Sequence, residues 1–416
     1  MAHQRYEQKN SLKTVLISVI EVCLSMGQAR PAEKADLLLT CHDFDRGSTV
    51  DGKPYAQITD SVAFFAELLG YKTITIAKPY SILTGNRAHG CPVSINFQSL
   101  CLTLLSYLLF GAYRRRLVLT LKTRMWTRLI QKVAPKLVVG VQPSEDLCAA
   151  CKSLGIKVYD AQHGVINRQH PWYSSRINLL EERLLPSGFL VWDEASAHGL
   201  SAAKEKGFDV LVIGHPEFLR YGYEKNNQSN IGRFMPKKQS HVNILITLQW
   251  GLDGIFFKPD EKGLMGLELI QVIKNSSEKI KWHIRMHPVQ MRKNYAKIRS
   301  DLLSMFGDSE KIDINDATLN PLPMVLSSID LHITYNSTVV VEAGWMGIPS
   351  AILCPHVDSG KYSSYYKSER ESGIAECVEY SETKIRAWID AKAHKLGCQN
   401  SVSADRIADF LSSELR

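Results

Sequence analysis

The sequence lacks the features that mark several protein classes. It opens without a charged segment followed by an apolar one, so we expect no signal peptide. Its most apolar stretch, residues 97–112, is interrupted by polar residues and falls short of the ~20 apolar residues of a membrane-spanning helix. Glycine and proline, at 26 and 16 residues, are too few for a collagen-like or low-complexity chain. We therefore expect a globular, cytoplasmic protein.

Cysteine is sparse and irregularly spaced. There are nine cysteines, and an odd number without an export signal indicates reduced thiols. The one Cys-x-x-Cys pair, Cys148 and Cys151, has no further ligands at a spacing suited to zinc. We expect both residues to be buried in a helix over residues 143–152, and we expect no metal site.

The sequence has only a small excess of positive charge. The 50 Lys and Arg residues against 42 Asp and Glu residues give a net charge of +8, which permits an anionic partner without requiring nucleic acid. Residues 114–136 contain no acidic residue and begin with three arginines, directly after the apolar stretch. An apolar patch beside a basic one suits the inner face of an anionic membrane, where we expect peripheral association. A core helix followed by a solvated basic face is the alternative.

The length of 416 residues suggests two domains. Short apolar runs alternate with helical patterns, which indicates parallel βαβ units. A polar, Asn-rich segment at residues 221–239 interrupts this pattern and is interpreted as a linker. We predict an α/β protein with two Rossmann-like, doubly wound domains, residues 1–220 and 240–416, facing a cleft. The expected strands are 35–41, 72–77, 136–141, 157–161, 188–192, 210–214, 243–248, 281–286, 330–335 and 350–354, with helices at 58–69 and 264–273 among others.

Polar residues follow the expected strand at 330–335. Asn336, Ser337 and Thr338 stand where a helix would begin, and a helix running to Gly347 would follow them. Free N–H groups and hydroxyls at a helix start bind anions such as a nucleotide phosphate. Ordinary helix capping would use the same residues, and the sequence alone does not separate the two readings.

A second group of polar residues ends the strand at 281–286. Arg285 and His287 are two residues apart and therefore share a face, and Pro288 ends the strand. A histidine at that place can hydrogen-bond a phosphate, and as imidazolium it can offset charge on a leaving phosphate. A lone buried histidine is more often structural.

The two groups together resemble the C-terminal half of bacterial glycosyltransferases of the two-Rossmann, GT-B architecture. The similarity is greatest to the sialyl-, polysialyl- and Kdo transferases of capsule and lipopolysaccharide synthesis, and it covers roughly residues 243–355. It implies that His287, Ser337 and Thr338 hold the donor phosphate and that Glu342 binds the donor ribose. The loop that faces the cleft in GT-B enzymes corresponds here to Gln249, Trp250 and Gly251.

The first half should hold the acceptor and the general base. Asp43, Asp45 and Arg46 follow the first expected strand, and a carboxylate there could take a proton from an acceptor hydroxyl. We favour Asp43, because Arg46 could pair with the neighbouring acid. The usual acidic motif of the sialyltransferases is absent, however, and a solvated turn would contain the same residues.

A rival base follows the expected strand at 157–161. Gln162, His163 and Gly164 resemble the His-Gly element of the teichoic-acid polyol-phosphate transferases, in which the histidine lies in the cleft. His163 is therefore the second candidate base. Arg46, Gln162 and Gly164 are the residues we expect to contact the acceptor.

The resemblance implies a transferase that moves Kdo or sialic acid from a CMP donor onto a bacterial surface polysaccharide or lipopolysaccharide. UDP-sugars stay open as donors. Helix N–H groups, Arg285 and His287 could stabilise the departing phosphate, so we expect neither a metal nor another cofactor. The alternatives are a CDP-polyol phosphotransferase of the teichoic-acid type, a UDP-sugar epimerase, and a nucleotide-binding subunit without activity.

Overall fold

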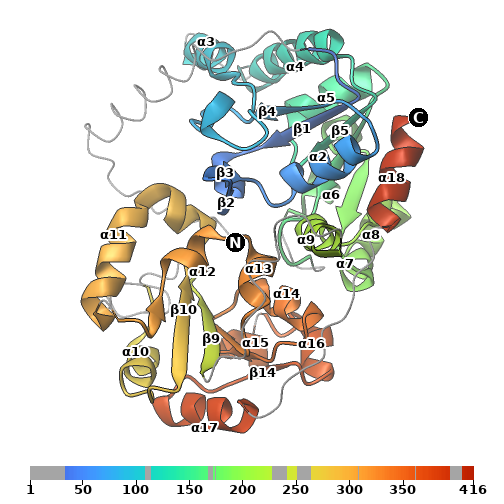
Figure 1. Ribbon diagram of the computed structural model, residues 1–416. Helices are drawn as coiled ribbons and strands as arrows, with labels where there is room; N and C mark the ends of the chain where they lie inside the picture. Colours follow the sequence, from blue (N-terminus) through green and yellow to red (C-terminus); the bar gives the residue numbers. More distant parts are fainter. Residues whose placement is uncertain are drawn as a thin grey trace.

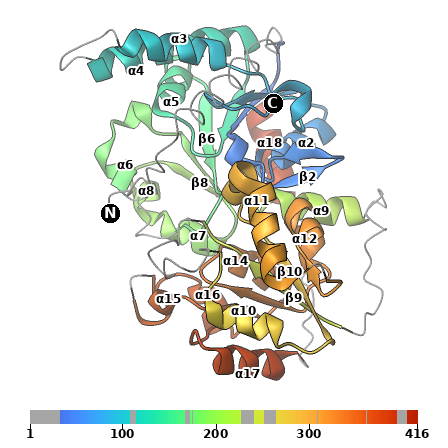
Figure 2. The same cartoon turned by 90° about the vertical axis from the view of Figure 1, so that its left-hand side faces the viewer.

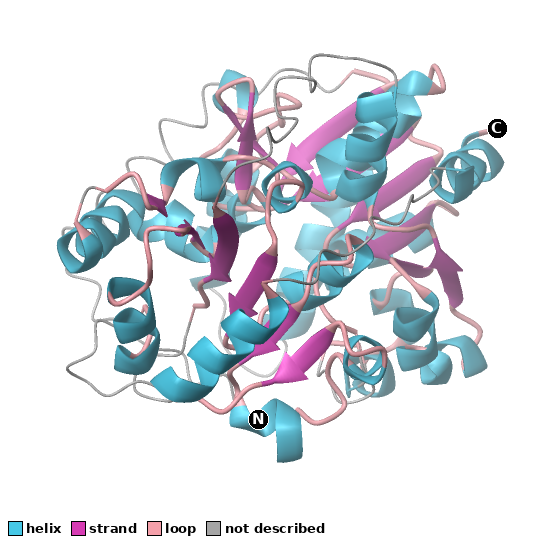
Figure 3. Ribbon diagram, turned by 60° about the horizontal axis from the view of Figure 1, so that its bottom comes forward, coloured by secondary structure: helices cyan, strands magenta, loops and turns pink. Residues whose placement is uncertain are grey.

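The computed structural model describes residues 33–107, 114–166, 172–173, 175–226, 241–250, 264–307, 309–360, 362–393 and 405–416. Its strands form two parallel sheets of six strands, one in each half of the chain, with helices around them (Figures 1 and 3). The prediction of an α/β protein with two doubly wound, Rossmann-like domains is confirmed.

The first sheet has the strand order β4-β1-β5-β6-β7-β8. Leu37 and Leu39 of its second strand pack in one apolar cluster and Leu38 in another, so helices cover both faces and the strands are apolar throughout. Its strands are β1 (Leu37–Cys41), β4 (Thr73–Ala77), β5 (Leu137–Gly140), β6 (Lys157–Ala161), β7 (Gly188–Val191) and β8 (Asp209–Val212). Its helices are α2 (Thr59–Leu68), α3 (Asn96–Tyr107), α4 (Arg114–Val133), α5 (Glu145–Ser153), α6 (Ser175–Leu179), α7 (Glu194–Gly199), α8 (Ser201–Glu205) and α9 (Pro216–Asn226).

The second sheet has the order β11-β10-β9-β12-β13-β14, so the chain reverses direction across the sheet between β9 and β12. Its strands are β9 (Val242–Thr247), β10 (Ile280–Arg285), β11 (Ile312–Asp313), β12 (Leu331–Thr334), β13 (Ser350–Ile352) and β14 (Ala375–Cys377). Its helices are α10 (Leu267–Lys274), α11 (Pro288–Phe306), α12 (Asn315–Leu319), α13 (Leu322–Leu326), α14 (Val339–Trp345), α15 (Pro355–Ser359), α16 (Lys367–Glu371) and α17 (Glu382–Lys392). Such a reversal point is where doubly wound sheets bind ligands.

The last helix, α18 (Asp405–Leu415), corrects the expected domain division. Ile407, Phe410, Leu411 and Leu415 are buried with the core of the first sheet, and Figure 1 shows this red helix against the upper half. The C-terminal residues therefore belong to the first domain. The expected linker also begins later, because residues 221–226 continue α9; residues 227–240 lie outside the described part.

The β1 end and the start of α11 bring the two domains into contact. The turn η2 (Asp43–Asp45) and the hairpin of β2 (Ser48–Val50) and β3 (Lys53–Tyr55) follow β1 and lie beside α11 and α12 (Figure 2). The Arg292 Nε donates to the Arg46 carbonyl at 2.7 Å, and the Thr49 hydroxyl donates to the Leu319 carbonyl at 3.1 Å. A Cβ atom on Gly47 would lie only 2.7 Å from Pro288 Cγ, so glycine permits this close approach.

The Cys-x-x-Cys pair lies in α5 (Glu145–Ser153). Cys148 and Cys151 are fully buried in α5, as expected, and burial raises the pKa of both thiols. Among the residues that the structure describes, none of the helices combines the length and the apolar character needed to cross a bilayer.

Candidate functional site

One polar network ties together three strand ends of the second sheet. The side-chain amide of Gln249, after β9, donates to the Asn336 carbonyl at 2.5 Å and accepts from the Asn336 N–H at 2.6 Å. Gln290 donates from Nε2 to the Gln249 carbonyl at 3.1 Å and accepts the His287 N–H at 2.9 Å. The loops after β9, β10 and β12 therefore hold one fixed arrangement at the reversal point of the sheet.

His287 caps the start of α11. Its Nδ1 accepts the Val289 N–H at 3.2 Å, which leaves the ring proton on Nε2. Burial lowers the pKa of His287 to about 4, so the ring is neutral at pH 7. His287 therefore offers a phosphate a neutral N–H donor, which is the first of the two roles that the sequence suggested.

The Ser337–Thr338 turn lies between β12 and α14. The Ser337 Oγ accepts the Val339 N–H at 3.3 Å, which leaves its hydroxyl hydrogen available to donate. Thr338 immediately precedes α14 and makes no side-chain cap bond to it. Across the cleft, a Cβ atom on Gly164 would lie 3.7 Å from the Thr338 methyl group, so the two predicted loops of different domains meet here.

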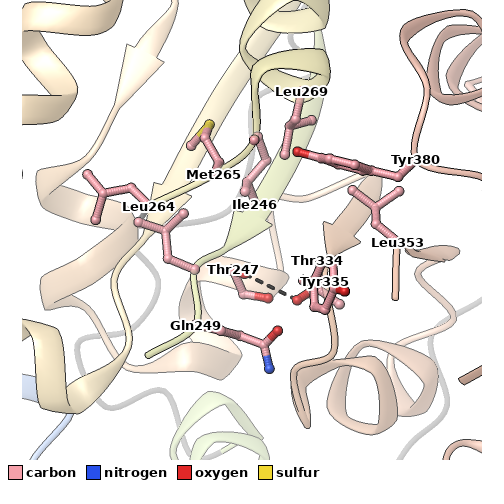
Figure 4. A pocket seen from close by; sticks show the side chains of 12 residues that line it. Ile246, Thr247, Gln249, Leu264, Met265, Leu269, Thr334, Tyr335, Leu353 and Tyr380 are labelled. Atoms are coloured by element: carbon pink, nitrogen blue, oxygen red, sulfur yellow. Dashed lines mark hydrogen bonds between the residues drawn. The ribbon is translucent and has the colours of Figure 1, made fainter. Parts of the chain in front are cut away.

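A small, partly open pocket lies at the carboxyl ends of β9 and β12 (Figure 4). Tyr335 and Tyr380 lie on one side of it, and Gln249 lies at its edge next to the polar network. Its walls are largely apolar, as in sites that bind planar organic groups. The lining residues are Ile246, Thr247, Leu248, Gln249, Leu264, Met265, Gly266, Leu269, Thr334, Tyr335, Leu353 and Tyr380.

His163 lies half-buried at the end of β6, next to Gly164. Its Nδ1 is 3.4 Å from the Tyr173 hydroxyl. Gln162 was expected to contact the acceptor, but its side chain is only 2% exposed. Its amide accepts the Trp192 N–H at 2.8 Å and donates to the Gly164 carbonyl at 2.9 Å, so it shapes this loop. The expected contact of Gln162 with an acceptor is therefore corrected.

The acids after β1 hold local backbone. Asp43 is 8% exposed, and its carboxylate accepts the N–H groups of Ile82 at 2.7 Å and Leu83 at 3.2 Å. Asp45 accepts the His42 N–H at 2.6 Å in a capping box. Both carboxylates thus stabilise turns, although Asp43 remains close enough to the second domain to interact electrostatically with Arg292.

Arg46 is placed inside the first domain. Its side chain is 1% exposed and pairs with Asp60 at 3.1 Å, rather than with Asp45. It also donates to the carbonyls of Pro54 and His89. A guanidinium enclosed in this way cannot contact an acceptor, so that expectation is corrected.

A group of buried charges lies where β8 and α9 meet the second domain. Arg285 is 8% exposed and donates to the Ala317 carbonyl at 2.6 Å, and it interacts electrostatically with the carboxyl groups of Glu217 and Glu342. The Glu342 carboxylate lies 3.4 Å from the His215 Nε2. Arg285 and Glu342 therefore face the domain interface in this structure, instead of lining an open donor site as expected.

Sequence reasoning missed Glu217. It is 3% exposed, and neither carboxylate oxygen has a hydrogen-bond partner among the described residues. Burial raises its pKa to about 8. The sequence signal is indirect: Glu217 follows Gly214-His215-Pro216 at a strand end, where a new helix begins at a domain boundary.

Trp250 and Gly251 end the described part of the loop after β9. Trp250 is 55% exposed, which favours contact with a ligand over a place in the core. Gly251 lies outside the described residues. Gly164 of the first domain thus lies next to Thr338 of the second, while Gln249, Asn336 and Gln290 connect to His287 on the second domain.

Comparisons with protein-family models and with curated proteins found no match. Among solved structures, the UDP-GlcNAc 2-epimerase of Neisseria meningitidis bound to UDP-GlcNAc is 14% identical, covers 91% of this chain and 99% of its own, and has a TM-score of 0.52. The chain has the GT-B fold. The UDP-GlcNAc 2-epimerase of Methanocaldococcus jannaschii is also 14% identical, with coverage of 91% and 99% and a TM-score of 0.50. The wall teichoic acid polymerase TagF with CDPG is 12% identical, with coverage of 97% and 95% and a TM-score of 0.50.

Proposed function

We propose that this protein is a nucleotide-sugar-dependent glycosyltransferase that acts on a bacterial surface glycan. One observation carries the proposal: the His163–Gly164 loop of one domain meets the Ser337–Thr338 turn of the other, beside the His287 network. A donor bound there would place its reacting carbon between the two domains. The apolar pocket next to Gln249 would hold the base of the nucleotide.

In this proposal the chemistry is a displacement at the sugar carbon. His163 takes the proton from the acceptor hydroxyl as the new glycosidic bond forms. The bond from the sugar to the nucleotide phosphate breaks, and the phosphate leaves with the electron pair. The His287 Nε2–H and the hydroxyls of Ser337 and Thr338 stabilise that charge, and the proposal includes no metal or other cofactor.

The donor class follows from motif resemblance. The paired His-Pro and Ser-Thr motifs favour CMP-activated Kdo or sialic acid. The epimerase of Neisseria meningitidis is bound to UDP-GlcNAc and the TagF polymerase to CDPG, so a UDP-sugar and a CDP-polyol are the other donors to test. A UDP-sugar epimerase is the second candidate function, because this fold is found in two such enzymes; it would need no acceptor.

Nucleotide binding is the first test. A nucleotide at ~100 times its Kd stabilises a protein by about 2.7 kcal/mol, which thermal-shift measurements with CMP, CDP, UDP and GDP would detect. Replacing His287 or Ser337 with alanine should raise the Kd for the nucleotide about 10- to 100-fold, because each variant loses a hydrogen bond to a charged phosphate group. Calorimetric titration of both variants gives the Kd.

Two exposed residues on the same half serve as matched controls for these variants. His241→Ala, at the amino end of β9, and Ser304→Ala should bind the nucleotide as the wild type does. Unchanged affinity in both His287→Ala and Ser337→Ala would contradict the donor site. Epimerisation of a UDP-sugar in the absence of any acceptor would favour the epimerase.

The acceptor half carries a surface suited to an anionic membrane, and we include this partner in the proposal. Helices α3 and α4 pack against each other at one end of the molecule (Figures 1 and 2). Exposed apolar side chains of the two helices are Phe97 (60%), Leu104 (58%), Leu105 (40%) and Leu117 (42%). Helix α4 also has exposed basic residues that lie four or eight residues apart and therefore share one face of the helix. They are Arg116, Arg124, Arg128 and Lys132. No acidic residue occurs between Glu67 and Glu145.

Replacing Arg116, Arg124 and Arg128 with serine should weaken vesicle binding about 100-fold, since each basic residue near an anionic leaflet contributes ~1 kcal/mol. Co-sedimentation with vesicles containing phosphatidylserine measures this, and added salt should weaken wild-type binding. The triple serine variant of Lys297, Lys367 and Lys384 removes the same charge from the second domain and serves as the control. A wild-type protein that does not co-sediment with anionic vesicles at low salt would contradict membrane association.

A further inference from the structure

Two exposed aromatic rings from different domains share one lysine at the edge of the cleft. Phe44 belongs to η2 of the first domain and is 37% exposed, and Trp250 follows β9 of the second domain and is 55% exposed. The Lys293 Nζ on α11 lies 5.6 Å from the centroid of Phe44 and 5.2 Å from that of Trp250. Both distances are within the range of a cation–π contact.

The Lys293 ammonium has no ion-pair partner in the part of the chain that the structure describes, and its side chain is exposed. The neighbouring Arg292 donates from Nε to the Arg46 carbonyl, while its buried Nη2 has no hydrogen-bond partner in the described part of the chain. Burial lowers the pKa of Arg292 to about 10, so it is still cationic at pH 7. Asp43 interacts electrostatically with Arg292, so it is the Lys293 ammonium whose positive charge coincides with the exposed aromatic surface.

These features together match a carbohydrate that carries an acid. The C–H face of a sugar ring packs against aromatic rings, and burying exposed aromatic surface favours the bound state. A carboxylate or phosphate on the same sugar would pair with a lysine ammonium that now rests only on the rings. A neutral sugar would gain the stacking and lose the charge pairing.

We propose that Phe44, Trp250 and Lys293 form a subsite for an anionic sugar unit of the acceptor. The subsite rests on the proposed transferase function, since it lies at the cleft edge where an acceptor would enter. Because the two domains each supply a ring, a bound sugar would contact both of them. A carboxylated and a phosphorylated sugar fit this chemistry equally, and the probes below separate them.

Calorimetric titration of the full-length protein with three oligosaccharides tests the subsite. The probes are an α2,8-linked sialic acid tetramer, mannopentaose bearing a 6-phosphate, and unmodified mannopentaose. At least one anionic probe should bind about tenfold more tightly than neutral mannopentaose. Lys293→Gln should remove that preference, Lys293→Arg should retain it, and Phe44→Ala should weaken every probe that binds.

Lys297→Gln is the matched control, because Lys297 is exposed on the same helix and pairs with Asp301 away from the rings. It should bind the probes as the wild type does. Equal affinity of wild type and Lys293→Gln for the anionic probes would overturn the proposal, and so would a wild type that binds none of the three. Nucleotide titration and donor turnover on the same samples separate this failure from a failure of the transferase function. The latter would appear as absent nucleotide binding or as conversion of a UDP-sugar without an acceptor.

Discussion

Replacing His163 with glutamine should lower glycosyl transfer by about 10²- to 10⁴-fold, which is what a positioned general base contributes. Glutamine keeps a polar side chain of similar length but cannot accept a proton at neutral pH. Nucleotide affinity should change little, because His287, Ser337 and Thr338 hold the phosphate in the proposed site. Initial rates of transfer, measured with saturating donor alongside a nucleotide titration, separate the two effects.

The geometry favours His163 over the carboxylate that the sequence pointed to first. His163 lies beside Gly164, which faces the Thr338 methyl group across the cleft. The Asp43 carboxylate instead accepts the N–H groups of Ile82 and Leu83, so it is held by a turn of its own domain. We therefore expect Asp43 to contribute to loop structure rather than to proton transfer.

Asp43→Asn is the companion variant for this assignment. It keeps one carbonyl oxygen for the backbone N–H groups and loses the charge, so it should lower the melting temperature. Its rate of transfer should stay within roughly tenfold of wild type. A rate loss above 100-fold in Asp43→Asn, with His163→Gln near wild type, would return the role of base to Asp43.

Ten of the twelve strands in the two sheets follow closely from the sequence, whereas the short edge strands β11 and β14 were not predicted. Leu37, Leu38 and Leu39 are all fully buried, so β1 is apolar on both faces and stands out as a continuous run. The placement of α18 could not be deduced in the same way. Its apolar stripe of Ile407, Phe410 and Leu411 identifies an amphipathic helix, but such a stripe can pack on either domain.

For the candidate site, the sequence motifs predicted which residues lie at strand ends but not which of them are buried. Motifs at strand ends located His287 and Ser337, because the carboxyl ends of parallel strands meet at one edge of a sheet. The motifs did not reveal burial. Arg46 and Gln162 stand in equally polar sequence contexts, yet each is at most 2% exposed, because tertiary partners such as Asp60 and Trp192 enclose them. Contacts between Phe44 and Lys293 depend on how two domains meet, which local sequence does not encode.

The pH dependence of stability should reveal the buried carboxyl group of Glu217. Burial raises its pKa from 4.5 to about 8, while Arg285 and Arg220 lower it and Glu342 raises it further. Because the folded-state pKa exceeds the unfolded one, the folded protein binds more protons between these two values. The stabilisation is complete below about pH 4.5 and is lost as the pH rises through about 8.

Glu217→Gln should remove this loss, since glutamine resembles the protonated carboxyl group and does not titrate. By linkage, the wild type should lose about 3 kcal/mol of unfolding free energy between pH 6 and pH 9 relative to the variant. Urea unfolding of both proteins at pH 6, 7.5 and 9 measures the difference, in which the contributions of all other titrating groups cancel. Glu205→Gln, an exposed acid on α8, is the control and should parallel the wild type. If the wild type and Glu217→Gln lose stability in parallel, Glu217 is ionised in the folded protein, and the domain interface must supply it with a charged or hydrated partner.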